Sequence, residues 1–274
     1  MEFWELIKYV LLGLLQGITE PIPVSSSGHL VIAREIFGIE AAGLSFEIFL
    51  NTASLLAVLF IYRYDILSIL GNLSRFLLKG ARDDDAIDDA RYTMYLIIAT
   101  IPVGVIGLLV NDLIGENISV GTVGVMLLVT GLALWFIKNK RGEKRDGELT
   151  VKDSLIVGFA QVVALTPGIS RSGASLVGAM AVGMNQKNAL RFVFLLYIPV
   201  SLGTGLLGIS DIVNDPNIDT LWVAYVLAFA ASVIATYYAL RWLQNVMQRG
   251  NLVIFAYYCF TIGTLSILYQ LFIA

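Results

Sequence analysis

The sequence contains little charge, one cysteine and one histidine. Charged residues make up 14% of its 274 residues and hydrophobic residues 57%, and the mean hydropathy is +0.79. A soluble core of this size does not need so much apolar surface, so the composition excludes a soluble globular domain and predicts an integral membrane protein. The lone Cys259 excludes an intrachain disulfide, and the lone His29 excludes any mechanism that needs two histidines.

Six apolar stretches are long enough to cross a bilayer as helices. They lack the alternating pattern of barrel strands, so we expect an all-α integral membrane protein. The six predicted transmembrane helices cover residues 46–64, 93–111, 119–138, 190–210, 220–242 and 251–273.

Two further segments, residues 5–36 and 154–186, have a different pattern. In each of them, two apolar arms flank a loop rich in Pro, Gly and Ser. Such short arms cannot cross about 30 Å of hydrocarbon at about 1.5 Å per residue, and Pro23 or Pro167 would break a continuous helix. These segments are therefore predicted to be re-entrant helical hairpins, whose tips are tolerated only inside the protein or beside water.

The loops of the two hairpins are repeats of one another. Adding 145 to the numbers of five residues in the first loop gives the same residue types in the second. The matched pairs are Gly13 and Gly158, Gln16 and Gln161, Ser25 and Ser170, Ser27 and Ser172, and Gly28 and Gly173. The chain is thus predicted to be one membrane domain, 1–274, with repeat one at about 1–140 and repeat two at about 150–274. Because three spans separate the loops, the second repeat enters the membrane inverted.

Basic residues predict the orientation. If each hairpin returns to its starting side, the connections at 63–93, 138–153, 185–191 and 241–250 share one face and carry most of the Lys and Arg residues. We expect this face to be cytoplasmic and both termini to lie outside the cell membrane. The opposite face has Lys8, Arg34 and acidic connections that include Asp112 and Glu116.

Four residues in the loops are the candidate catalytic groups. Arg171 suits phosphate oxygens, unless it is a helix-end arginine that reaches the surface. Glu20 is a metal ligand or a proton acceptor, or else the ion-pair partner of Arg171. His29 lies among serines and is a base or nucleophile rather than a satisfied core histidine. Ser26 occupies the position that Arg171 has in the other loop, while at least one of its neighbouring serines caps a helix.

At these residues the sequence resembles the undecaprenyl-diphosphate phosphatase family of the bacitracin-resistance type. The resemblance rests on residues 16–20, 23–29 and 167–175, together with Phe46-Glu47 and the run 51–54. The resemblance implies that the protein removes the terminal phosphate of a polyprenyl diphosphate with the help of a divalent cation, Mg²⁺ or Ca²⁺. It also implies that Glu20, Ser26, His29 and Arg171 occupy the catalytic positions of the family. The expected partners are that lipid, the membrane and a second copy of the chain, and no nucleic acid.

The other polar loop residues are expected to bind the substrate or the metal. The predicted substrate-binding residues are Gln16, Ser25, Ser27, Ser170, Ser172 and Gly173, and the predicted metal ligands are Glu20 and Gln16. Gln16 stands where many members of the family have glutamate, which predicts weaker metal binding or binding by Glu20 alone. Arg191 stands where bacterial members usually have an acidic residue. This second departure leaves the details of the substrate open and indicates a distant branch of the family, such as an archaeal one.

Two questions stay open at the level of sequence. The nucleophile is either Ser26 with His29 as its base, or His29 itself, with Glu20 holding the metal or the imidazole. The function is either this hydrolysis or, as the alternative, transport or flipping of an anionic lipid by an inverted-repeat protein. A serine beside a base favours hydrolysis, because a transporter has little use for a nucleophile.

Overall fold

The computed structural model describes residues 3–39, 44–110, 118–215 and 218–273, and these residues are almost entirely helical. A short 3₁₀ turn, η2 (Asp146–Glu148), precedes α7. In chain order the helices are α1 (Phe3–Thr19), α2 (Ser26–Phe37), α3 (Leu44–Ile61), α4 (Arg63–Leu78), α5 (Asp84–Val110), α6 (Val120–Ile137), α7 (Val151–Val163), α8 (Arg171–Ala181), α9 (Gln186–Leu207), α10 (Ile209–Val213), α11 (Ile218–Gln248) and α12 (Val253–Phe272). The predicted all-α class is confirmed.

The six predicted spans fall on α3, α5, α6, α9, α11 and α12. Within the described residues, five helices are long and apolar enough to cross a membrane on their own: α5, α6, α9, α11 and α12. The sixth candidate is α3 taken together with α4, which follows after a bend of 73°. The chain is a multi-pass membrane protein. Asp112 and Glu116 lie outside the described residues.

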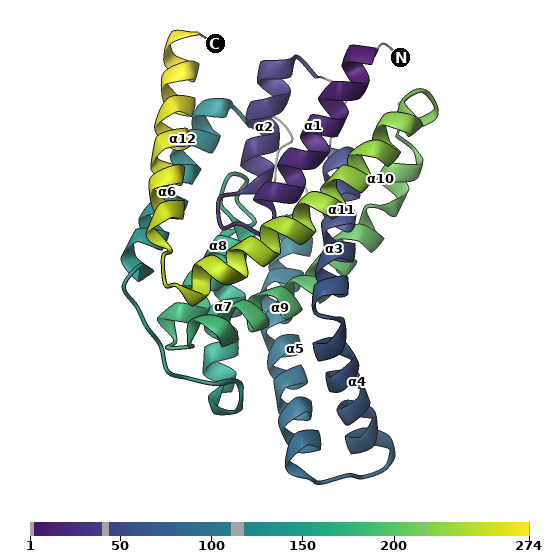
Figure 1. Ribbon diagram of the computed structural model, residues 1–274, viewed down its shortest axis with the longest axis vertical. Coiled ribbons are helices and arrows are strands. Elements are labelled where there is room, and N and C mark those ends of the chain that lie inside the picture. The colour runs from purple at the N-terminus through teal and green to yellow at the C-terminus, as the bar shows by residue number, and fades with distance from the viewer. Residues whose placement is uncertain (1–2, 40–43, 111–117, 216–217, 274) are drawn as a thin grey trace.

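Residues 63–93 are not the open connection that the sequence predicted. They form α4 and the first turns of α5, which pair as an antiparallel hairpin at the lower end of Figure 1. Asn72 donates a hydrogen bond to Asp89 over 2.8 Å, and Arg75 forms an ion pair with Asp83 at 2.7 Å. The charged side chains of this segment therefore lie on helices and not in a loop. They are spaced so that apolar residues such as Ile69 share one helix face, which packs against the rest of the protein.

Both predicted hairpins are present as pairs of helices joined by a tight segment. In the first, α1 ends at Thr19, just before Pro21, and α2 begins at Ser26. In the second, α7 ends at Val163 and α8 begins at Arg171. The arm α1 has 17 residues and is longer than its α7 counterpart, which has 13. Each hairpin thus places a helix N-terminus directly after its polar loop.

Equivalent helices of the two predicted repeats pack in equivalent ways. Helix α1 lies against α11, and α7 lies against α5. At Gly13 a Cβ atom would lie 2.2 Å from the carbonyl oxygen of Ala228, and at Gly158 it would lie 2.6 Å from that of Ala99. The matched glycines therefore permit the same backbone contact in both halves. This packing agrees with the predicted division into repeats, which stays a prediction.

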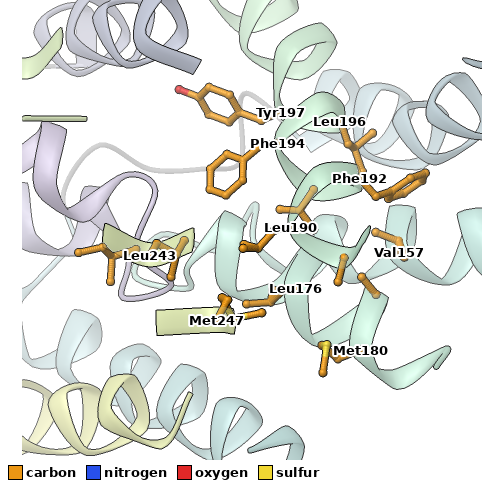
Figure 2. Packing of buried hydrophobic residues seen from close by; sticks show 14 of the residues in the cluster. Val157, Leu176, Met180, Leu190, Phe192, Phe194, Leu196, Tyr197, Leu243 and Met247 are labelled. Carbon is orange, nitrogen blue, oxygen red and sulfur yellow. The ribbon is translucent and has the colours of Figure 1, made fainter. Parts of the chain in front are cut away.

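The main core contains most of the buried side chains of α9. Figure 2 shows Leu190, Phe192 and Leu196 of α9 against side chains of the neighbouring helices. Val157 belongs to α7, Leu176 and Met180 to α8, and Leu243 and Met247 to α11. Phe194 and Tyr197 leave α9 on another side, toward the cavity described below. This core therefore fixes the second hairpin against α9 and α11.

The connections rich in basic residues converge at one end of the molecule. The backbone of Lys144 exchanges hydrogen bonds with Gly183 and Asn185 at 2.9 and 3.1 Å, and Gly250 lies against the Arg141 side chain. Arg191 of α9 reaches Asp65 of α4 at 2.6 Å. Both chain termini lie at the opposite end, at the top of Figure 1. These contacts agree with the predicted shared basic face, whose side of the membrane stays a prediction.

Candidate active site

The tips of the two hairpins touch each other. The hydroxyl of Ser172, in the first turn of α8, lies 3.2 Å from the carbonyl oxygens of both Glu20 and Ile22 and can donate to either. Residues of the two predicted repeats are therefore joined directly at the loops, as the inverted-repeat hypothesis requires. This contact brings the carboxylate of the first loop and the guanidinium of the second loop to one place.

Glu20 is the centre of a hydrogen-bond cluster. The hydroxyl of Ser26 donates to Glu20 Oε2, and the Gln16 amide donates to the same oxygen over 3.0 Å. The other oxygen, Oε1, accepts a hydrogen bond of 3.0 Å from the amide of Asn51. A carboxylate that accepts several hydrogen bonds is held in one orientation, so Glu20 is positioned to receive the proton of Ser26.

Asn51 was not among the predicted site residues, although it lies in the run 51–54 that carries part of the family resemblance. It comes from α3, is 6% exposed, and its own carbonyl oxygen accepts a hydrogen bond from the hydroxyl of Tyr197 over 3.2 Å. A single asparagine on an apolar helix was therefore a usable signal, because a buried amide needs a polar partner.

A small cavity lies beside this cluster. Its polar and apolar walls come from α3, α7, α8, α9, α11 and the first loop. The lining residues are Glu20, Pro21, Val58, Gln161, Arg171, Ser172, Ser175, Val193, Phe194, Tyr197 and Thr236. It therefore offers one acid, one base and an apolar wall to a ligand.

Arg171 has hydrogen-bonding capacity left for a ligand. Its Nη1 atom is buried and has no hydrogen-bond partner among the described residues. Among the described residues, no ion pair joins Arg171 to Glu20. An internal salt bridge between the two residues therefore does not explain why Arg171 is buried here. A buried guanidinium nitrogen without a partner is costly, and an anion in the cavity would satisfy it.

His29 lies in the first turns of α2, directly after the first loop. It is 6% exposed and, like Ser26, is not among the residues that line the cavity. Nδ1 lies 2.7 Å from the carbonyl oxygen of Ser25, and Nε2 lies 2.8 Å from the hydroxyl of Tyr258 on α12. Neither partner is Ser26 or Glu20. Among the described residues, the structure thus shows no hydrogen bond for two of the alternatives, His29 as the base for Ser26 and Glu20 as the group that holds the imidazole, and the roles of these residues stay predictions. The reason is that helix α2 turns the ring toward α12.

The remaining loop serines mainly stabilise the loops. Ser25 and Ser170 are the N-caps of α2 and α8, and their hydroxyls accept hydrogen bonds from the backbone N–H groups of Gly28 and Gly173 over 3.3 and 3.0 Å. Ser27 lies 3.5 Å from Ser25 in the first loop. The expectation that at least one loop serine caps a helix is confirmed. Of the predicted substrate-binding residues, Ser172 is the one that lines the cavity.

A divalent cation would find oxygen ligands at Glu20 and Gln16. Within the described residues, no cluster contains three or more His, Cys, Asp or Glu side chains suited to a metal. However, the Oε1 atom of Gln16 is buried and has no hydrogen-bond partner among the described residues. The Nε2 atom of the same amide donates to the Glu20 carboxylate, so this oxygen lies near that carboxylate. An orphaned amide oxygen beside a carboxylate suits a hard cation such as Mg²⁺ or Ca²⁺. The donor set therefore fits the predicted ion.

Comparison with known proteins identifies the family. Residues 9–265 match the family described as "Bacitracin resistance protein BacA". The chain belongs to this family. It is 55% identical over 271 residues to the undecaprenyl-diphosphatase of Oceanobacillus iheyensis, covering 98% of both chains. It is 53% identical over 269 residues to undecaprenyl-diphosphatase 1 of Bacillus cereus, and 51% identical over 263 residues to undecaprenyl-diphosphatase 1 of Halalkalibacterium halodurans. In each case at least 95% of both chains is covered.

These identities correct one expectation about the BacA-family chain. A protein that shares more than half of its residues with three bacterial relatives is not a distant branch, so Arg191 does not mark one. Arg191 has a structural explanation. Its guanidinium binds Asp65 and Asp146 and lies 4.7 Å over the ring of Tyr92, which joins α9 to α4, α5 and the η2 turn.

Proposed function

We propose that this protein hydrolyses undecaprenyl diphosphate to the monophosphate and inorganic phosphate. This reaction would return the lipid carrier to cell-envelope or glycan synthesis. The family membership and the names of the relatives support the proposal. The observation that carries it is the contact of Ser26 with Glu20 next to a cavity into which Arg171 brings an unsatisfied nitrogen. A nucleophile, a proton acceptor and an anion binder are thus together.

The first chemical step uses Ser26 and Glu20. The Ser26 oxygen attacks the terminal phosphorus and its proton passes to Glu20, to which it already donates. The bond from this phosphorus to the bridging oxygen breaks, and the lipid leaves as the monophosphate. In the second step, water attacks the phosphoserine, Glu20 returns to the serine oxygen the proton that it took in the first step, and inorganic phosphate leaves with the protons of the water. Gln16 and Asn51 hold the carboxylate throughout.

Arg171 and the start of α8 stabilise the transferred phosphoryl group. The guanidinium suits two phosphate oxygens at once, and the first backbone N–H groups of a helix favour negative charge. Arg171 and Ser172 are the first residues of α8, and both line the cavity. A divalent cation at Glu20 and Gln16 would neutralise further charge on the phosphate oxygens. Preference between Mg²⁺ and Ca²⁺ then depends on ligands that the substrate and water supply.

The cavity walls suit a lipid diphosphate. Val58, Val193 and Phe194 contribute apolar surface to the lining, while Glu20 and Arg171 contribute its charges. A polyprenyl diphosphate has this same division between an apolar chain and a polar head. The amphipathic lining therefore favours a lipid substrate over a soluble phosphate ester.

The orientation in the membrane is part of the proposal. The face at which the basic connections converge is cytoplasmic, and both termini lie outside the cell membrane. The support is the excess of Lys and Arg on that face, which the positive-inside rule associates with the cytoplasm. Homodimer formation is a further proposal, and it needs a measurement of mass in detergent.

The deciding experiment is release of inorganic phosphate from undecaprenyl diphosphate by the purified protein in detergent, with Mg²⁺ or Ca²⁺ present. We expect release that disappears in Ser26→Ala and in a chelator. A folded protein that binds the lipid and never releases phosphate would favour the alternative, a transporter or flippase. Vesicles with the lipid in one leaflet would then show whether the lipid changes sides.

A further inference from the structure

Tyr258 lies 229 residues from His29 in sequence and contacts it directly. Its hydroxyl is 2.8 Å from His29 Nε2, and the two rings stack with centroids 5.5 Å apart and planes inclined by 12°. Tyr258 belongs to α12, whereas His29 is in the first turns of α2. The contact therefore ties the last helix of the chain to the loop that carries Ser26.

The partners of the imidazole define its tautomer. A backbone carbonyl oxygen only accepts hydrogen bonds, so the 2.7 Å contact with Ser25 requires a proton on Nδ1. In the neutral ring Nε2 then carries the lone pair, and it accepts the hydroxyl proton of Tyr258. Both nitrogens are thus occupied, and neither has a lone pair left for a phosphate or for the Ser26 hydroxyl.

Ser25, whose carbonyl oxygen contacts the His29 imidazole, has an unusual backbone conformation. Ser25 has φ 67° and ψ 92°, and it is the one non-glycine residue with positive φ among those that the structure describes. Such conformations are sparsely populated and persist when the surroundings hold them in place. Ser25 immediately precedes Ser26 and caps α2. Its backbone conformation therefore decides where the Ser26 hydroxyl points.

We infer that Tyr258 and His29 are a pair of positioning residues: the hydroxyl of Tyr258 holds the imidazole in the Nδ1–H tautomer, and the imidazole holds the turn at Ser25 that aims Ser26 at Glu20. This inference rests on the proposed function for its meaning in catalysis, but its geometry can be tested without activity. On this account His29 acts through the loop and never touches the phosphate.

The single histidine of the chain makes the tautomer directly measurable. Protein labelled with ¹⁵N-histidine in detergent should give one pair of imidazole signals, with Nδ1 protonated and Nε2 as a hydrogen-bonded acceptor. Tyr258→Phe should move the Nε2 signal, whereas Tyr257→Phe should not, because the Tyr257 ring faces Trp135 instead. A proton on Nε2, or equal shifts in both variants, would overturn the inference.

Kinetics test the positioning role. Tyr258→Phe should lower kcat for phosphate release by roughly 10- to 100-fold with KM little changed, because a displaced nucleophile loses rate rather than affinity. Tyr257→Phe is the matched control. His29→Asn can still donate to the Ser25 carbonyl from the Nδ1 position, so it should keep more activity than His29→Gln. Equal kcat in the two tyrosine variants, or greater activity in His29→Gln, would exclude the role.

The NMR experiment and the kinetic experiment together distinguish a failure of this inference from a failure of the proposed function. If the wild-type protein releases no phosphate, the proposed function fails, while the NMR experiment still decides the geometry. If the wild-type protein is active and Tyr258→Phe behaves like Tyr257→Phe, the positioning role alone is wrong. Because Tyr258→Phe removes only a hydroxyl, it keeps the ring stack, and its melting temperature shows whether the variant is folded.

Discussion

The hydroxyl of Ser26 donates its hydrogen bond to the carboxylate of Glu20, across the turn that joins α1 to α2. Two amides, from Gln16 and Asn51, hold the same carboxylate from other directions. The group closest to the candidate nucleophile is therefore an acid with fixed orientation. This relationship changes the proton acceptor in the proposed reaction from His29 to Glu20, and the first two predictions follow from it.

Replacing Glu20 by Gln should lower kcat for phosphate release by at least about 100-fold, because the amide cannot take the Ser26 proton. Phosphate release from undecaprenyl diphosphate measures this. Glu35→Gln, which neutralises an exposed carboxylate on α2, is the matched control and should stay close to wild type. If Glu20→Gln remains within threefold of that control, Glu20 is not the base.

Rapid acid quench with substrate labelled in the terminal phosphate should trap a phosphoenzyme at Ser26. Phosphoserine survives acid, whereas phosphohistidine does not. Ser26→Ala should abolish the trapped label, and Ser27→Ala should retain it, since Ser27 makes no contact with Glu20 among the described residues. An acid-labile phosphoenzyme that is lost when His29 is replaced would show that His29 attacks and would contradict the scheme.

Arg171→Lys should reduce kcat/KM by more than about tenfold, which corresponds to roughly 1.4 kcal/mol of transition-state stabilisation. Lysine keeps the charge but loses the planar fork that would bind two phosphate oxygens. Arg249→Lys, at an exposed position on the basic face, is the control for the substitution itself. Activity near wild type in a folded Arg171→Ala protein would rule out the anion-binding role.

Single cysteines should report the orientation of the protein. In a Cys259→Ala background, Asn214→Cys should react with an impermeant thiol reagent added outside intact cells. Arg145→Cys should react only after the cells are opened. Both positions are exposed, so access depends on the side of the membrane. Labelling of both from the same side would overturn the inverted orientation.

Arg191→Ala should lower the melting temperature in detergent without removing activity at low temperature. The substitution leaves the carboxylates of Asp65 and Asp146 without their shared partner, and this loss destabilises the fold by about 1–3 kcal/mol. The exposed Arg241, whose guanidinium lies near Tyr237, provides the control Arg241→Ala. An unchanged melting temperature would mean that the Arg191 network contributes nothing to stability.

Local patterns along the chain were sufficient for the class and for the list of loop residues. Hydrophobic length predicted the helices that became α5, α6, α9, α11 and α12, because spanning a bilayer depends on consecutive apolar residues. The repeated loops pointed to Glu20, Ser26 and Arg171, since an ionisable or nucleophilic residue between apolar arms stands out in sequence. The same reasoning mistook 63–93 for an open connection, because charges on a helix surface resemble those of a loop.

Which of these residues touch one another was decided only by the tertiary structure. Glu20 binds Asn51 of α3, and His29 binds Tyr258 of α12, so the hydrogen bonds of the imidazole go to residues other than the one that it was expected to activate. These contacts depend on how helices far apart in sequence pack and on the direction in which α2 turns each side chain. The sequence by itself determined which chemical groups the two loops carry. Packing determined that Glu20, and not His29, accepts the hydrogen bond of Ser26.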